Sequence, residues 1–144
     1  MRPLRSRVTQ KKIIPAKVLE SVRDKSAGGV VLFLGTVRNR SEGRSVVGLE
    51  YETYREMAEK RLAELEREVR ARWRVKKMTM IHREGRLRVG EVSVAVAVSS
   101  EHRAEAFEAA RFAIDRIKTS APIWKREVLK GGRKLWVDGA PIQR

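Results

Sequence analysis

The segment from Glu91 to Ser120 most constrains what this chain can fold into. Its first part, Glu91 to Ser99, alternates valines with small residues, which is the period of a β-strand covered on both faces. One face carries Val92, Val94, Val96 and Val98, and the other carries Ser93, Ala95, Ala97 and Ser99. The small residues allow a helix to pack closely against that face. A covered strand followed directly by a long helix predicts a mixed α and β domain.

The second part of this segment predicts a long helix. Ser100 is the expected N-cap, and the helix should end near Ser120 because Pro122 disfavours helical dihedral angles at the preceding residue. Apolar residues recur at helical spacing, and we expect four of them to face the core: Phe107, Ala110, Ile114 and Ile117. The corner at Pro122 is then followed by a strand.

The remaining elements complete an α+β pattern. We expect an edge strand at 7–14, a central buried strand at 30–37, and further strands at 46–54 and 75–84. A hairpin should join 123–129 to 134–137, with a short tail after Gly139. Helices are expected at 16–25 and 55–73. The prediction is one domain over residues 1–144, with a mostly antiparallel sheet and about three helices.

The charge of the chain limits the kinds of partner it can have. Its 33 Lys and Arg against 18 Asp and Glu leave a net charge of +15, which attracts polyanions, phosphorylated small molecules or acidic proteins. A basic RNA-binding module is therefore one function to weigh. The charged fraction of 35% and the scarcity of Asn and Gln also resemble usage in thermophiles.

Several classes of chemistry are excluded or disfavoured. The chain has no cysteine, so disulfides, thiolate catalysis and thiolate metal ligands are impossible. With only two histidines, far apart in sequence, we expect no metal site. No apolar run approaches the roughly 20 residues of a membrane span. The first residues contain no apolar signal region, so we expect a cytoplasmic protein that does not act at a membrane.

Basic side chains at three places are candidates for a site. Lys118 and Lys125 flank the Pro122 corner and can face one pocket, although lysines near a helix C-terminus also simply complement the helix dipole. The strand-to-helix junction from Ser100 to Arg103 offers free N–H groups to an anion, or is merely a capped helix start. Arg38 directly follows a predicted buried strand. His82 is interpreted as a hydrogen-bonded packing residue, with a role in a site as the alternative.

Motifs in a fixed order carry a resemblance to a known family. They are Gly35-Thr36-Val37-Arg38-Asn39, Ile81-His82-Arg83-Glu84-Gly85, Ser99 to Arg103, Phe107-Glu108-Ala109, and Ile117-Lys118 followed by Pro122-Ile123-Trp124-Lys125-Arg126-Glu127. Over roughly residues 28 to 130 the chain closely resembles the large, catalytic subunit of molybdopterin synthase, the MoaE family. The loop after Asn39 and the region after Gly132 depart from the family pattern.

The resemblance implies a fold, an activity and partners. The implied fold is of the α/β-hammerhead type. The implied activity is sulfur transfer in molybdenum cofactor biosynthesis, from the C-terminal Gly-Gly thiocarboxylate of a small ubiquitin-like carrier subunit to cyclic pyranopterin monophosphate, forming the dithiolene of molybdopterin. Two large subunits would form a central homodimer within a heterotetramer. No cofactor is implied, and the resemblance disfavours nucleic acid as the partner.

The resemblance also implies residue roles. It makes Lys118 and Lys125 the catalytic lysines, with Lys118 beside the thiocarboxylate and Lys125 on the pterin side. Substrate contacts are implied for Arg38, His102 and Arg103, with Arg126 as a further contact. These roles agree with elementary chemistry. A chain without cysteine must receive its sulfur on a partner, and both implied substrates are anions. Clustered cations lower one another's proton affinity, so one lysine can serve as a base.

Overall fold

The computed structural model describes residues 4–137, and the expected tail after Gly139 lies outside them. The helices are α1 (Pro15–Ser21), α2 (Arg55–Arg72) and α3 (Arg103–Ser120). The strands are β1 (Arg7–Thr9), β2 (Gly29–Thr36), β3 (Arg40–Ser41), β4 (Arg44–Thr53), β5 (Val75–Arg83), β6 (Gly85–Arg88), β7 (Val92–Ser100), β8 (Ile123–Leu129) and β9 (Lys134–Trp136). The predicted α+β class, with three helices among the described residues and mostly antiparallel pairing, is confirmed.

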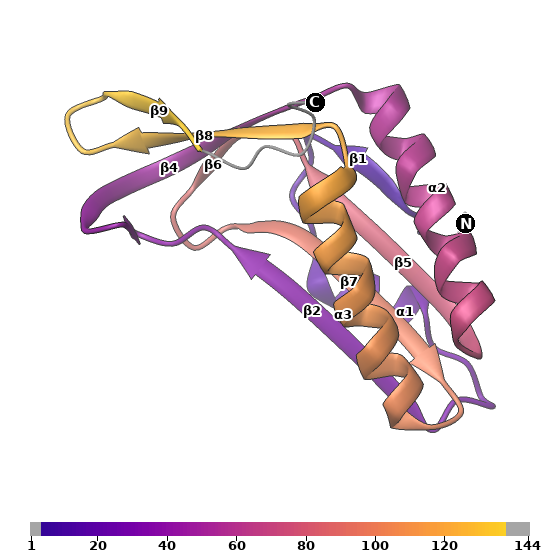
Figure 1. The fold of residues 1–144 in the computed structure, drawn as a ribbon. Helices are drawn as coiled ribbons and strands as arrows, with labels where there is room; N and C mark the ends of the chain where they lie inside the picture. Colours follow the sequence, from indigo (N-terminus) through magenta and orange to yellow (C-terminus); the bar gives the residue numbers. More distant parts are fainter. Residues whose placement is uncertain (1–3, 138–144) are drawn as a thin grey trace.

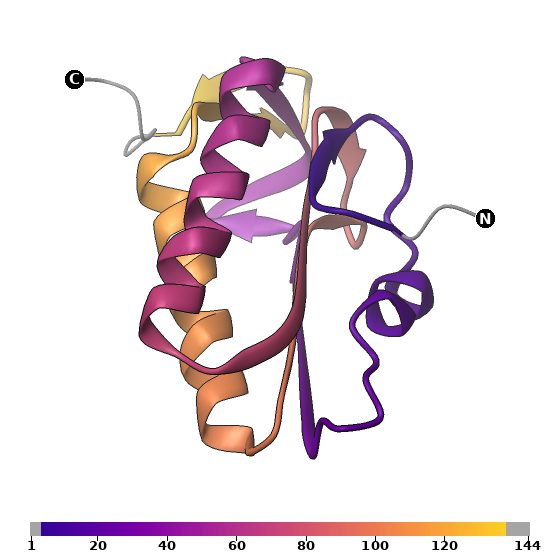
Figure 2. The ribbon, with the colours of Figure 1, turned by 90° about the vertical axis from the view of Figure 1, so that its right-hand side faces the viewer.

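A four-stranded sheet in the order β1-β5-β7-β2 forms one half of the molecule. Only β1 pairs in parallel, with β5, and the other neighbours are antiparallel. Helices α2 and α3 cover one face of this sheet and α1 covers the other (Figure 2). The two faces of β7 separate as predicted from Val94 onward: Val94, Val96 and Val98 join the core under α2 and α3, and Ala95 and Ala97 join a smaller cluster with α1. Val92, predicted to share the face of the other valines, packs against the smaller cluster instead, where the β2–β7 register shifts.

The placement of β2 corrects the expectation of a central buried strand. β2 is the outer strand of the sheet, and Val30 and Phe33 are 41% and 36% exposed. An apolar run predicts that a strand is buried, but it does not say whether residues of the same chain or of another molecule bury it. β1 lies at the opposite edge, as predicted, although it spans fewer residues than expected.

The start of α3 also differs from its prediction. Ser100 is the last residue of β7, and its hydroxyl donates to the carbonyl of His102 at 2.5 Å, so it caps no helical N–H group. The N-cap position belongs to His102, without a side-chain hydrogen bond. Phe107, expected inward, is 61% exposed, and small residues such as Ala106 and Ala109 fill the interface instead. The helix ends at Ser120 as predicted, and Ala121 takes extended dihedral angles before Pro122.

A five-stranded sheet forms the other half and extends away from the helices (Figure 1). Its path is β3-β4-β8-β9, and β6 pairs with β4. The β8–β9 hairpin was predicted. The short strands β3 and β6 were not, because the sequence around them reads as polar loop. The turn between β3 and β4 is tight, with positive φ at Glu42 (49°) and Gly43 (79°). Within residues 4–137, no helix has the length and apolar character needed to cross a membrane.

Candidate active site

A cavity of about 120 Å³ lies where the two sheets meet the end of α3. Gly35 and Ser93 reach it from the four-stranded sheet, and Tyr51 and Lys125 reach it from the five-stranded sheet. Lys118, in the last turn of α3, completes this part of the wall. We call this space the lysine cavity. It is formed by elements that are distant in sequence, and it joins the two lysines that flank the proline corner.

The alternation of β8 determines which of its side chains enter the cavity. Lys125 and Glu127 are two residues apart and both line it, whereas Arg126 points to the other face of the strand. Across the β4–β8 pair, Tyr51 is the register partner of Lys125. Arg38, which follows the end of β2, lines the same cavity, and so does Arg40 at the start of β3, so four cationic side chains line it.

The electrostatic setting of Lys125 lowers the pKa of its amine. Burial lowers the pKa of Lys125, the nearby charge of Lys118 lowers it further, and Arg38 adds a smaller effect in the same direction. Glu127 acts in the opposite direction. This carboxylate is only 7% exposed and lies 3.6 Å from the guanidinium of Arg44. The cavity therefore combines an amine that is easier to deprotonate with cations that can hold an anion.

A buried histidine lies behind the cavity wall. The ring of Tyr51 meets His82 edge to face, with centroids 4.9 Å apart. The Nδ1 of His82 is 2.7 Å from the carbonyl of Arg83, and burial lowers the pKa of His82 to about 4. The ring is buried and hydrogen-bonded, as its interpretation as a packing histidine requires. Burial also raises the pKa of Tyr51, with a hydrogen bond involving Ser93 opposing that change, so both rings are neutral near pH 7.

Two of the predicted substrate contacts lie at the far end of α3. His102 and Arg103 stand at its N-terminus, and Lys118 is in its last turn. From Arg103 to Lys118 the helix rises about 22 Å, at roughly 1.5 Å per residue. Both side chains are exposed, and His102 lies 3.2 Å from Glu101. A single chain therefore does not bring His102 and Arg103 to the lysine cavity.

Arg126, the remaining predicted contact, is engaged outside the cavity. Its guanidinium donates to Glu50 at 2.6 Å and stacks on the ring of Trp136 at 4.9 Å. Lys134 approaches the same Glu50 carboxylate at 3.1 Å. These contacts give Arg126 a structural role between β4, β8 and β9.

Glu127 and Tyr51 line the cavity but were not among the predicted site residues. A sequence signal existed for Glu127, since it follows Lys125 by two residues in a predicted strand and so shares its face. For Tyr51 the alternation of its strand indicates a buried side chain and nothing more. Its position opposite Lys125 depends on the β4–β8 register, which the sequence does not state.

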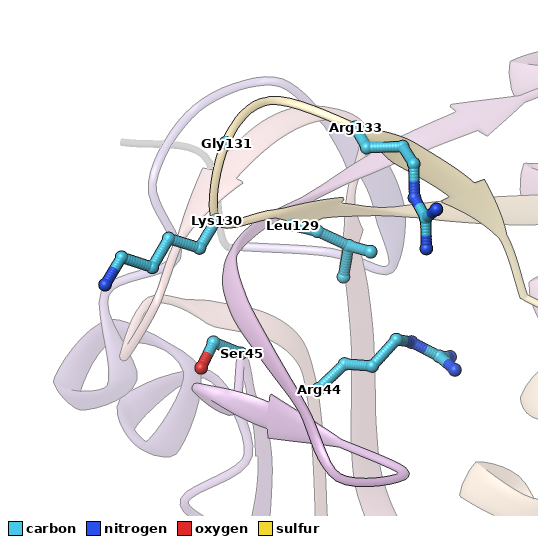
Figure 3. Close-up of a pocket in the computed structure, with 6 residues that line it drawn as sticks. All are labelled: Arg44, Ser45, Leu129, Lys130, Gly131 and Arg133. Carbon is cyan, nitrogen blue, oxygen red and sulfur yellow. The ribbon is translucent and has the colours of Figure 1, made fainter.

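A second, more open cavity of about 500 Å³ lies at the β8–β9 turn (Figure 3). Arg44, Lys130 and Arg133 line it. In Figure 3, Arg44 and Arg133 point to one side and Lys130 extends to the other, so the three cations do not converge on one point. Neither Lys118 nor Lys125 reaches this cavity. The lysine cavity is thus the better candidate for an active site.

The fold and the lysine cavity together define a class: an α+β protein with a cavity lined by several cationic side chains, among them a lysine whose pKa is lowered. Comparison with protein families makes this specific. The family model described as "MoaE protein" matches residues 8–120, and the chain belongs to this family.

Individual relatives agree with the family assignment. The chain is 44% identical to the molybdopterin synthase catalytic subunit of Thermoplasma volcanium over 90% of its own length and 94% of that protein. Among solved structures, molybdopterin synthase from Staphylococcus aureus superposes with a TM-score of 0.86 at 36% identity, over 95% of this chain and 98% of that one. A chain from the complex of subunits 1 and 2 of molybdopterin-converting factor from Helicobacter pylori shares the fold, with a TM-score of 0.74 at 20% identity over 92% of this chain and 89% of that one.

Proposed function

We propose that this chain is the catalytic subunit of a molybdopterin synthase. It receives sulfur from the C-terminal thiocarboxylate of a small ubiquitin-like carrier and transfers it to cyclic pyranopterin monophosphate, which makes it a sulfurtransferase of molybdenum cofactor biosynthesis. The observation that carries this proposal is the convergence of Lys118, Lys125 and Arg38 in one cavity of about 120 Å³. Family membership supports the same activity.

The cavity suits the charges of the proposed reactants. A thiocarboxylate and a cyclic phosphate are both anions, and four cationic side chains, Arg38, Arg40, Lys118 and Lys125, line the space. When the acyl carbon of the thiocarboxylate is attacked, negative charge builds on its oxygen, and a nearby lysine or arginine stabilises that charge. Lys118 and Arg38 take this electrostatic role in our proposal. Lys125, whose pKa is lowered, is assigned the proton transfer on the pterin side.

A second copy of the chain accounts for His102 and Arg103 in this proposal. Because they lie about 22 Å along α3 from Lys118, they can serve a lysine cavity only if it belongs to another molecule. The outer strand β2 carries exposed Val30 and Phe33, which a partner copy would cover. Arg103 adjoins this strand: a Cβ added to Gly29 would lie 3.1 Å from the Cα of Arg103. A homodimer formed through this edge would bring the start of α3 to the interface.

Reconstitution tests the proposed function. The purified chain is mixed with a thiocarboxylated small carrier and cyclic pyranopterin monophosphate, and dithiolene product is measured. We expect product only when all three components are present. Tight RNA binding that weakens steeply with salt, without any dithiolene product, would instead support the alternative of a basic RNA-binding module. A cytoplasmic location remains a prediction, which fractionation of cells expressing the chain would check.

A further inference from the structure

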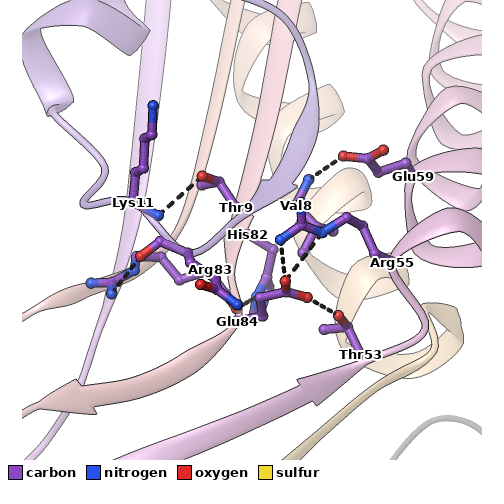
Figure 4. A network of polar contacts seen from close by, with 10 residues as sticks. Val8, Thr9, Lys11, Thr53, Arg55, Glu59, His82, Arg83 and Glu84 are labelled. Carbon is purple, nitrogen blue, oxygen red and sulfur yellow. Dashed lines mark hydrogen bonds and ion pairs between the residues drawn. The ribbon is translucent and has the colours of Figure 1, made fainter.

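Arg83 is a buried charge that the proposed reaction does not use. It is the last residue of β5 and is 8% exposed, and in Figure 4 its side chain and that of Glu84 extend in opposite directions. Its guanidinium donates to the carbonyl of Gln10 at 3.0 Å and to the carboxylate of Glu91 at 3.3 Å. Within residues 4–137 its Nε is buried and has no partner. A buried charge with one unpaired N–H group is a weak source of stability, which indicates that its value lies in what it holds.

Glu91, the partner of this guanidinium, uses its carboxylate to close a turn. One carboxylate oxygen accepts the main-chain N–H of Arg88 at 2.7 Å, and the main-chain N–H of Glu91 donates to the carbonyl of Arg88 at 3.1 Å. We call residues 88–91 the Glu91 turn. Arg83 contacts the other carboxylate oxygen. The hydrogen bond from Arg88 and then the charge of Arg83 lower the pKa of Glu91 against the effect of burial, so the carboxylate is ionised near pH 7.

The Glu91 turn holds the residue that precedes Arg38. Val37 lies just beyond β2, which ends at Thr36, and it is 3% exposed. Its N–H donates to the carbonyl of Glu91 at 3.0 Å, and its carbonyl accepts the N–H of Gly90 at 2.8 Å. Both main-chain groups of Val37 are therefore bonded to the turn. The next residue, Arg38, lines the lysine cavity, so its position depends on how firmly the turn holds its neighbour.

We propose that Arg83 is a positioning residue that acts through Arg38. Its guanidinium orients the carboxylate of Glu91, and that carboxylate keeps the Glu91 turn closed. The main chain of the closed turn fixes Val37 and thereby directs the Arg38 side chain to the lysine cavity. Arg83 itself touches neither reactant. Its effect on sulfur transfer rests on the proposed function, whereas its support of the turn does not.

Amide hydrogen exchange tests the support of the turn without any reaction. In R83M the amides of Val37 and Gly90 should exchange about tenfold faster than in wild type, because the turn opens more easily without its charged contact. E91Q, which keeps the shape of the side chain and removes its charge, should speed the same two amides. The matched control is R55M, which removes the partner of Glu84 and should leave both amides unchanged. Unchanged exchange in R83M would overturn the proposal, and if R83M does not fold, unchanged exchange in E91Q would do so.

A double-mutant cycle tests whether Arg83 acts through Arg38. We expect R83M to lower kcat/KM for dithiolene formation about 10- to 100-fold in the otherwise wild-type chain, and to change it little in a chain that already carries R38A. Residues that act through one another are non-additive, whereas a general weakening of the fold lowers activity equally in both backgrounds. R55M, the control, should have the same effect with and without R38A. Equal losses from R83M in both backgrounds would overturn the positioning role. A wild-type chain that makes no dithiolene is a failure of the proposed function alone, and the exchange measurement then decides the inference.

Discussion

Lys125 and Tyr51 face each other as register partners across the β4–β8 pair, and both line the lysine cavity. This relationship places the amine with the lowered pKa against a neutral aromatic wall. A negatively charged or hydrated neighbour at that position would let Lys125 keep its proton more easily. The register of two strands thus contributes directly to the chemistry that the cavity can perform.

Replacement of Lys125 should abolish sulfur transfer without disturbing the fold. We expect K125A to lose about 10²- to 10⁴-fold in rate, the range for a positioned acid or base. K125R should fail similarly, because a guanidinium does not release its proton near neutral pH. Single-turnover measurements of dithiolene formation check this, with circular dichroism to confirm folding. Full transfer by K125A would contradict the assigned role.

The rate should rise with pH over a range set by Lys125. Its pKa is lowered from the ordinary lysine value of 10.5, so the active amine form appears at lower pH than for an ordinary lysine. Glu127 opposes this lowering, and E127Q should therefore move the rising limb of the pH–rate profile to still lower pH. The control is E52Q, since Glu52 is an exposed carboxylate of the same sheet and does not line the cavity. A limb that stays in place in E127Q would contradict this reading of the electrostatics.

The same pKa shift has a consequence for stability. The unfolded chain holds its Lys125 proton more tightly than the folded chain. At pH values between the lowered pKa of the folded state and 10.5, unfolding therefore takes up a proton. The contribution of Lys125 to the free energy of unfolding should therefore become more favourable as pH rises through this window. Replacement of Lys125 by methionine, which cannot titrate, should remove this contribution to the pH dependence of the free energy of unfolding. Urea melts of wild type and K125M at several pH values measure the difference.

Mixed dimers test whether two chains build one site. In a dimer of K125A and R103A chains, one cavity would contain an intact Lys125 and receive an intact Arg103 from its partner. We expect both variants to be inactive alone and activity to return on co-expression, in about half of the sites of each mixed dimer. If both residues served a site within one chain, each site would lack one of them and no activity would return.

The polar network around Glu84 should stabilise the fold in a pH-dependent way (Figure 4). Burial tends to raise the pKa of Glu84, but hydrogen bonds from Arg55 and Thr53 outweigh this effect, and the pKa is lowered below the ordinary glutamate value of 4.5. This stabilisation is present above pH 4.5 and is lost as pH falls through the lowered pKa. E84Q should reduce the free energy of unfolding by about 1–3 kcal/mol at pH 7. The difference from wild type should shrink in acid, which denaturant melts at pH 7 and pH 3 would show.

Local periodicity accounts for what could be predicted of the fold. α2, α3, β7 and the β8–β9 hairpin were found close to their observed positions. Each has a face whose spacing identifies its type, or a breaker such as Pro122 that ends it. The short strands β3 and β6 have no such period. They exist because β4 offers them backbone hydrogen-bonding groups, and that cannot be seen in their own residues.

The candidate site was predicted in part, because the sequence indicates only which residues close together in the chain share a face or a corner. Both lysines adjoin one corner of the chain. Predicting the end of a helix and the start of the following strand was therefore enough to place both at one cavity. His102 and Arg103 stand at the other end of the same helix. The predicted length of that helix already implies the separation, because each helical residue adds about 1.5 Å.

The sequence by itself determined the types of element, the proline corner, the excess of cations and the absence of any thiol. Tertiary structure decided that β2 lies at an edge, that Tyr51 stands opposite Lys125, that Glu127 and Arg38 join the lysines, and that Arg126 does not. The physical reason is that side-chain periodicity records which face of an element is buried. Which elements become neighbours depends on contacts between residues far apart in the chain, and those contacts form the cavity.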